Sequence, residues 1–242
     1  MRKKVCYNIL GDKIMKKAYK IIIKSAVSLV LLAAILLISP FFDVGSPYPA
    51  FNILGEADMN RNGKPDSLDI LEGARADAKN MPTYNDQYHE GGYPPDNIGV
   101  CADVIWRAFK NAGYDLKKMV DADIRNRPEF YTDIKKPDPN IDFRRVVNLI
   151  VFFRTCSPAL TVDIKETDEW LPGDIAVFAN RYGKPDHIGI ISDIRAQDGT
   201  PFLIHNSGQA EREENALPKL SVIAHFRFDA TMLPHDMIFP WE

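Results

Sequence analysis

Three residues of the chain have the types and positions that thiol-based acyl chemistry requires. Cys101 follows a loop rich in Gly and Pro and opens a segment whose apolar residues recur at helical spacing. His187 and His205 lie in two later segments that have the composition of strands. A thiol, an imidazole base and a polar group that orients the base form a catalytic set. We therefore expect Cys101 as nucleophile, His187 as base and His205 as the orienting residue.

Several alternatives to this assignment stay open. A histidine on a strand is more often structural than catalytic, and Asn206 competes with His205 for the third role. A disulfide between Cys101 and Cys156 is possible in an exported domain and would remove the nucleophile. Zinc chemistry is disfavoured, because the chain has no C-x-x-C, H-x-x-x-H or H-E-x-x-H spacing.

The position of Cys101 at the start of a helix has its own chemical consequence. Free N–H groups and the helix dipole stabilise a thiolate there, so we expect a lowered pKa for this thiol. The N–H of Cys101 is one expected oxyanion donor, and the loop at residues 93–97 is the expected source of the second. Asp103 and Arg107 follow in the next helical turns, where capping the helix and contacting substrate are equally plausible roles.

The elements that must position these residues follow from the apolar patterns. A helix is expected from Cys101 to the stop signal at Gly113. Strands are expected at 174–179, 187–193, 202–206 and 221–228, with Glu211–Glu214 as a solvated loop. Gly189 shares a strand face with His187 and is expected to leave room beside the imidazole. Helices followed by an antiparallel meander make the fold class α+β.

Residues 58–69 have the spacing of an EF-hand-type loop. Oxygen-bearing side chains alternate, Gly63 stands at the sixth position, and a carboxylate stands at the twelfth. The expected Ca²⁺ ligands are Asp58, Asn60, Asn62, the carbonyl of Lys64, and Asp69. Asp rather than Glu at the twelfth position indicates a weak, structural site. The alternative is a polar turn that caps the following helix.

The N-terminal region has the charge pattern of a membrane anchor. Residues 1–25 carry eight Lys or Arg and one acidic residue, and residues 26–42 carry no charge. We expect a cytoplasmic basic tail at 1–25, a transmembrane signal anchor at 26–42 and a linker at 43–57. A cleaved signal peptide is the alternative. The domain at 70–242 is then extracytoplasmic on the cell membrane, and the net charge of −3 gives no reason to expect nucleic-acid binding.

Several blocks of the sequence together resemble a known family. They are GGYPPDNIGVCADVIWRAFKNAGYDL, RRVVNLIVFFR, WLPGDIAVF, HIGIISD and PFLIHNSG. The chain resembles the NlpC-type papain-like cysteine peptidases and, more closely, the YijF-like domain-of-unknown-function family within that superfamily. The resemblance implies a papain-like fold, in which the helix bearing the cysteine packs on an antiparallel sheet. It also implies Cys101, His187 and His205 as the triad.

The activity implied by the resemblance is hydrolysis of an amide, with a peptidoglycan peptide as substrate. Two alternatives differ in what the site does. An acyl or peptidyl transferase would use the same triad, because an amine can intercept the acyl-enzyme. A calcium-stabilised surface binding module would use none of the three triad residues.

Overall fold

An antiparallel five-stranded sheet and four α-helices form the part of the chain that the computed structural model describes, residues 57–158, 160–208 and 211–242. The expected α+β class is therefore confirmed. The expected basic tail, the anchor at 26–42 and nearly all of the linker lie outside the described residues. Within the described ranges, no helix has both the length and the hydropathy to cross a membrane.

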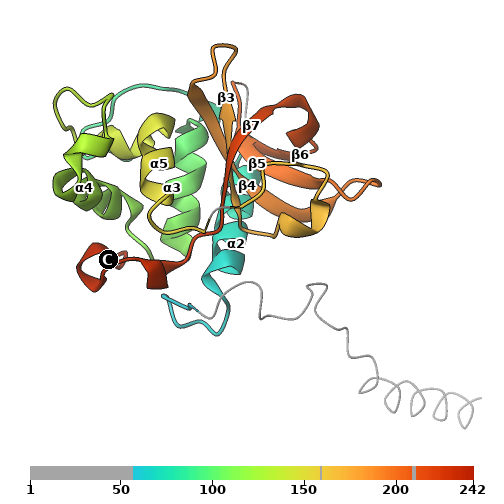
Figure 1. Cartoon of the computed structure of the whole chain (residues 1–242). Coiled ribbons are helices and arrows are strands. Elements are labelled where there is room, and N and C mark those ends of the chain that lie inside the picture. Colours follow the sequence, from blue (N-terminus) through green and yellow to red (C-terminus); the bar gives the residue numbers. More distant parts are fainter. Residues whose placement is uncertain (1–56, 159, 209–210) are drawn as a thin grey trace, which may run out of the picture. The chain divides into compact units, whose positions relative to one another are not determined.

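The helices precede the sheet along the chain, as expected (Figure 1). They are α2 (Asp66–Asn80), α3 (Cys101–Asn111), α4 (Leu116–Asn126) and α5 (Val146–Phe153). The strands of the large sheet are β3 (Ile175–Ala179), β4 (Pro185–Arg195), β5 (Pro201–Asn206), β6 (Glu211–Glu214) and β7 (Ser221–Phe226). Two short strands, β1 (Thr83–Tyr84) and β2 (Ile98–Gly99), pair in parallel.

The order of the strands in the sheet is β6-β5-β4-β3-β7. Strands β3, β4 and β5 form the expected meander, and β6 extends it at one edge. The chain then returns across the sheet, so that β7 pairs with β3 at the other edge. The expected solvated loop at Glu211–Glu214 is therefore wrong, because these four residues form an edge strand that is hydrogen-bonded to β5.

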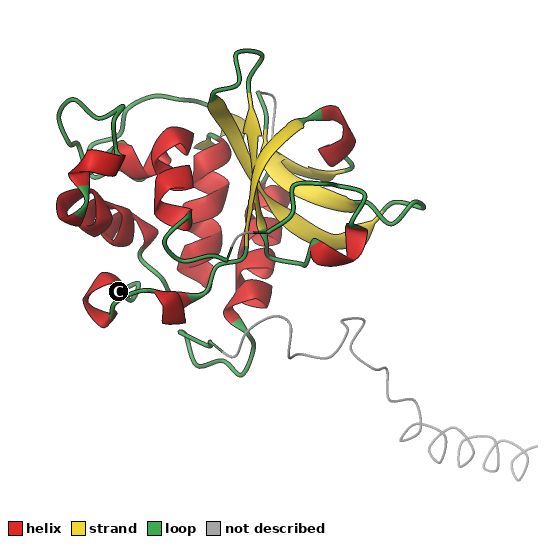
Figure 2. Ribbon diagram, viewed as in Figure 1, coloured by secondary structure: helices red, strands yellow, loops and turns green. Residues whose placement is uncertain are grey.

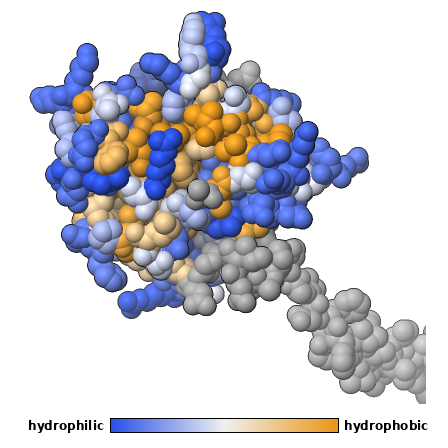
Figure 3. Space-filling model, in the orientation of Figure 1, coloured by the Kyte–Doolittle hydropathy of each residue, from blue (hydrophilic) through white to orange (hydrophobic). Residues whose placement is uncertain are grey.

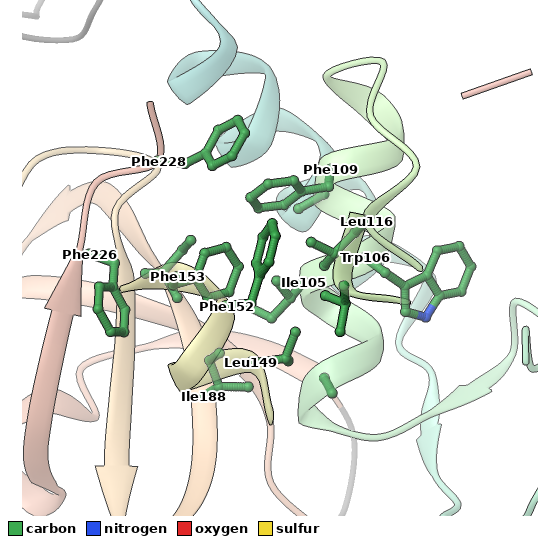
Figure 4. Packing of buried hydrophobic residues seen from close by; sticks show 14 of the residues in the cluster. Ile105, Trp106, Phe109, Leu116, Leu149, Phe152, Phe153, Ile188, Phe226 and Phe228 are labelled. Carbon is green, nitrogen blue, oxygen red and sulfur yellow. The ribbon is translucent and has the colours of Figure 1, made fainter. Parts of the chain in front are cut away.

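Helices α3 and α5 pack against β4, the central strand of the sheet (Figure 2). The core between them is strongly aromatic: Phe109 of α3 faces Phe153 of α5 and Phe228, which follows β7 (Figure 4). Burial of apolar area on this scale is the main stabilising term of a domain. It fixes the start of α3 above β4, and this fixes the position of Cys101 relative to His187.

The turn before β3 ties the sheet to α2. Gly173 has a φ of +86°, and a Cβ at this position would stand 2.0 Å from the carbonyl oxygen of Ser67. Only glycine fits both the left-handed backbone and this close approach. Asp174, next in the chain, accepts hydrogen bonds from His225 and from Arg227.

The sheet half also contains a second, smaller apolar cluster, in which the ring of Trp170 stacks on His225 with centroids 3.7 Å apart. On the face of the molecule in Figure 3, hydrophobic residues gather toward the middle, and hydrophilic residues dominate the outline.

Candidate active site

Cys101 is the first residue of α3 and lines an open cleft of about 290 Å³. The short strand β2 and then Val100, whose backbone is extended, lead directly into the start of α3. The cleft is lined by Tyr84, Asp86, Val100, Cys101, Ile141, Arg144, Arg145, Val146, Val147, Pro185 and Asp186. The thiol is thus close to a solvent-connected space, although Cys101 itself is only 6% exposed.

Burial raises the pKa of Cys101 to about 12. The expected lowering at the helix start is therefore wrong. The N–H groups of Ile188 and Ala102 hydrogen-bond to the sulfur and favour the thiolate, but desolvation outweighs them. Asp103 and Asp186 raise the pKa further through their negative charges. At neutral pH the group is a thiol that needs a base.

The expected base, His187, and its expected partner, His205, are brought together. Nε2 of His187 and Nδ1 of His205 lie 2.7 Å apart, a hydrogen-bond distance. The two residues come from neighbouring strands β4 and β5, and the register places His205 opposite Gly189, two residues from His187. The contact is therefore the diagonal cross-strand pair that this register allows.

Gly189 is required for a different reason from the one expected. A Cβ at Gly189 would lie 2.8 Å from the carbonyl oxygen of Ile204 and 2.9 Å from the side chain of Leu203. The missing side chain lets the two strands approach, rather than opening space for an incoming group. The close approach in turn allows the two imidazoles to meet.

His187 is a neutral imidazole in this environment. Desolvation, followed by the charge of His205 when that ring is protonated, lowers the pKa of His187 to about 4. Its Nε2 is engaged by His205, and its Nδ1 has no hydrogen bond within the described residues. The thiol of Cys101 contacts the N–H of Ile188, the residue next to His187. Within the described ranges, however, no direct Cys101–His187 hydrogen bond is formed.

Asn206, the competitor for the third role, has another function. Its Nδ2 donates to the carbonyl oxygens of Pro82 and Gly99. Gly99 lies two residues before Cys101, so Asn206 fixes the segment that enters α3 from the sheet side. Asn206 follows His205 in the chain, so its side chain points to the opposite face of β5, as expected from strand alternation.

Asp103 and Arg107 are buried and structural. Asp103 caps α3 by accepting from the N–H of Val100 and forms a two-point ion pair with Arg144 at 2.7 and 2.8 Å. Arg107 pairs with Asp77 and donates to two loop carbonyl oxygens. Of the two expected alternatives, helix capping is the role that Asp103 has.

The loop at residues 93–97, the expected source of a second oxyanion donor, lies away from the cleft. None of the residues 93–97 lines the cleft, and Tyr93 instead packs against Trp106 and donates to Asp115. Tyr84, from strand β1, does line the cleft beside Cys101. Burial raises the pKa of Tyr84, and the negative charge of Asp86 adds to the shift, so the hydroxyl keeps its proton.

Glu214 is the residue of the site that the sequence analysis missed. Its Oε1 lies 3.2 Å from Nε2 of His205 and extends the pair to a chain of three groups. The four residues Glu211–Glu214 are all charged, a composition that is typical of a solvated loop. A signal for Glu214 is its spacing from His205. Nine residues that include one turn can bring two side chains together on neighbouring antiparallel strands.

The remaining cysteine and histidine of interest lie elsewhere. Cys156 is buried, and burial raises its pKa. Both Cys101 and Cys156 are free thiols, so the disulfide alternative is wrong in this structure. His225 is not a neighbour of the site; it bonds to Asp174 and to the carbonyl oxygen of Thr161.

The expected calcium ligands gather before and at the start of α2. Asn60 and Asn62 each donate from Nδ2 to the carboxylate of Asp69, at 2.8 to 3.0 Å. Asp58 accepts from the backbone N–H groups of Asn62 and Gly63. These residues form a tight turn, which the positive φ of Gly63, +86°, permits. The helix begins at Asp66, so its first turn lies inside the expected loop at 58–69.

The oxygen-bearing groups of this set are of the kind that Ca²⁺ prefers. Asp69 is 1% exposed, and no ion pair neutralises it within the described part of the chain. The amide oxygens of Asn60 and Asn62, which a cation would need, accept here from the backbone N–H groups of Asn62 and Lys64. The carbonyl of Lys64 would complete the ligand set, while its Nζ pairs with Glu72 outside it.

Comparison with known proteins identifies the family. Residues 71–228 match the model of a family described as a domain of unknown function (DUF1287). The chain is 35% identical over 169 residues to the uncharacterized protein YijF of Escherichia coli (strain K12), which covers 67% of this chain and 82% of YijF. No solved structure matches the chain. The matched region contains Cys101, His187, His205 and Glu214, and the chain belongs to this domain-of-unknown-function family, with YijF among its relatives.

Proposed function

We propose that the chain is a cysteine amidohydrolase that acts on peptidoglycan peptides outside the bacterial cell membrane. The observation that carries the proposal is the hydrogen-bonded pair His187–His205, because His187 stands next to Ile188, whose backbone N–H contacts the thiol of Cys101. Cys101 in turn lines an open cleft. A helix-borne thiol against a strand-borne imidazole pair is also the arrangement that the NlpC-type papain-like superfamily implies. Placing the domain in that superfamily is part of the proposal.

The mechanism begins from neutral partners. Nδ1 of His187 takes the proton of the Cys101 thiol as the sulfur attacks the carbonyl carbon of the amide. The C=O pair of electrons moves onto oxygen, and the N–H of Cys101 and the hydroxyl of Tyr84 stabilise the oxyanion. Protonated His187 then returns the proton to the leaving nitrogen as the C–N bond breaks. A water molecule, deprotonated by His187, releases the carboxylic acid and restores the thiol.

The cleft suits a polar peptide with charges of both signs. Asp86 and Asp186 are exposed at its edge, and Arg145 is exposed on the side formed by α5. Arg144 does not add to this surface charge, because Asp103 neutralises it. An amino group and a carboxylate on one short peptide can therefore both find a partner in the cleft.

The location and the metal site belong to the same proposal. The uncharged segment 26–42 would anchor the chain, with residues 1–25 in the cytoplasm and the domain outside. Ca²⁺ held by Asp58, Asn60, Asn62, Lys64 and Asp69 would fix the start of α2. A filled oxygen cage far from the thiol supplies no chemistry to the reaction.

The test is incubation of the full-length chain with purified muropeptides in reducing, calcium-containing buffer, followed by mass spectrometry. We expect new free amines and carboxylates with the wild type and with Cys156→Ala, and none with Cys101→Ala or His187→Ala. Exchanged amides without net hydrolysis would favour a transferase. Binding without turnover by wild type and Cys101→Ala alike would favour a binding module and contradict the proposal.

A further inference from the structure

We propose that Glu214 is a positioning residue that sets the tautomers of both imidazoles and so makes Nδ1 of His187 the base. The inference rests on the proposed function for its catalytic meaning. The hydrogen-bond pattern that carries it is independent of any substrate.

The argument follows the protons from the carboxylate inward. A carboxylate only accepts hydrogen bonds, so the 3.2 Å contact with Oε1 of Glu214 requires a proton on Nε2 of His205. A neutral imidazole has one N–H, and desolvation lowers the pKa of His205, which favours that neutral form. Nδ1 of His205 is then an acceptor.

The same logic applies to the next ring. Nδ1 of His205 is 2.7 Å from Nε2 of His187, so Nε2 of His187 must donate. His187 is neutral as well, and its single proton is therefore on Nε2. Its Nδ1 has a free electron pair and can accept a proton from Cys101. With the opposite tautomer of His187, Nδ1 would carry the proton and could accept none from Cys101.

The fold holds Glu214 in the place that this role demands. Strand β6 pairs with β5 so that His205 lies opposite Arg212, and Glu214 is the diagonal neighbour on the same face. The adjacent Glu213 is bonded to Arg75 of α2 and to Ser192 of β4. This second set of contacts pins the edge strand from its other face and prevents Glu214 from sliding along His205.

No other described group can replace the carboxylate. Asn206 points to the opposite face of β5 and is bonded to Pro82 and Gly99. Arg212 lies 3.5 Å from Glu214 and is a donor only, so it can orient the carboxylate but cannot accept from His205. Glu214 is therefore the one described acceptor at Nε2 of His205.

The direct test measures the tautomers. The full-length chain has five histidines, and ¹⁵N-labelled imidazoles of its folded form give separate signals for protonated and unprotonated ring nitrogens. His187→Gln and His205→Gln assign the signals. We expect the Nε2–H form of both rings in the wild type and in Glu214→Gln, which keeps an acceptor. In Glu214→Ala we expect a mixture that includes the Nδ1–H form of His187.

The second test measures the base. The rate of alkylation of Cys101 by iodoacetamide at pH 7, corrected with Cys101→Ala, should fall about 10- to 100-fold in Glu214→Ala and much less in Glu214→Gln. Glu129→Gln removes one charge from an exposed 3-10 turn and should change nothing. Unfolding curves for each variant separate a lost tautomer from a lost fold.

The two proposals fail in different ways. An unchanged His187 tautomer and an unchanged alkylation rate in a folded Glu214→Ala variant would overturn the role of Glu214. Shifted tautomers together with an absence of muropeptide turnover in the wild type would support that role and contradict the hydrolase.

Discussion

At the scale of single residues, the site rests on groups that are neutral when no substrate is bound. Burial raises the pKa of Cys101 to about 12 and lowers the pKa of His187 to about 4. Between about pH 4 and about pH 12, Cys101 is a thiol and His187 is a neutral imidazole, so the two do not form a thiolate–imidazolium pair. In the proposed reaction the proton must therefore move while the sulfur attacks, and the base matters more than the helix dipole.

The pH dependence of the reaction should show this. The lowered pKa means that His187 keeps its free electron pair until the pH falls to about 4, so kcat/KM should decline only below about pH 5. The raised thiol pKa means that no thiolate plateau appears at neutral pH. Stopped-flow or mass-spectrometric rates from pH 3 to 10 measure both. An alkylation plateau from pH 4 to 8 would indicate a resting ion pair and contradict the assignment.

Tyr84 offers a second prediction at this scale. Tyr84→Phe keeps the ring in the cleft and removes only the hydroxyl, so kcat on a muropeptide should fall about 10²- to 10³-fold, with a smaller change in KM. Tyr88→Phe is the matched control, because Tyr88 is also an exposed tyrosine but lies outside the cleft lining. Equal effects of the two substitutions would remove Tyr84 from the oxyanion site.

At the scale of elements, the sequence predicts those parts of the site whose signal is local. Cys101 at a helix start and His187 on a strand follow from apolar spacing and composition, and both elements are present. Strand β6 was missed because four polar residues at a sheet edge carry no apolar alternation. The raised thiol pKa was missed because burial depends on how α3 packs against β4, which spacing does not show.

The start of α3 gives a prediction for an element. Asp103 is 0% exposed and holds Arg144 and the N–H of Val100, so Asp103→Ala leaves a buried guanidinium unpaired and the helix uncapped. The free energy of unfolding should fall by about 3–5 kcal/mol in denaturant titrations. Asp186→Ala, an exposed carboxylate at the same cleft, should stay within about 0.5 kcal/mol of wild type. Similar values for the two would contradict a buried ion pair.

At the scale of the whole described domain, the residues of the proposed chemistry are divided between two halves. The helical half supplies the thiol, and the sheet supplies the imidazoles and Glu214. The proposed calcium loop contacts the C-terminal end of α3, the helix that begins with Cys101. Asn60 donates to the carbonyl of Asn111, and Gly113 packs against Asn60. Metal binding would therefore stabilise the domain through α2 and the C-terminal end of α3.

Calcium should thus raise thermal stability without changing the catalytic groups. With a dissociation constant of about 10⁻⁴–10⁻³ M, 10 mM Ca²⁺ should add about 1.4–2.7 kcal/mol and raise Tm by about 3–10 °C. Asp69→Asn should abolish the Ca²⁺-dependent part of the rise, and Mg²⁺ at the same concentration should give little. An identical Tm with calcium and with a chelator would leave the polar-turn alternative.

The position of β6 has a consequence for motion. It is a strand of four residues at the edge of the sheet, and such strands open by local fluctuation more readily than central ones. Each opening would detach Glu214 from His205 while leaving Cys101 and His187 in place. The fraction of molecules that are ready to react would then be set by a local opening equilibrium, and the amide hydrogen-exchange rates of residues 212–214 would report it directly.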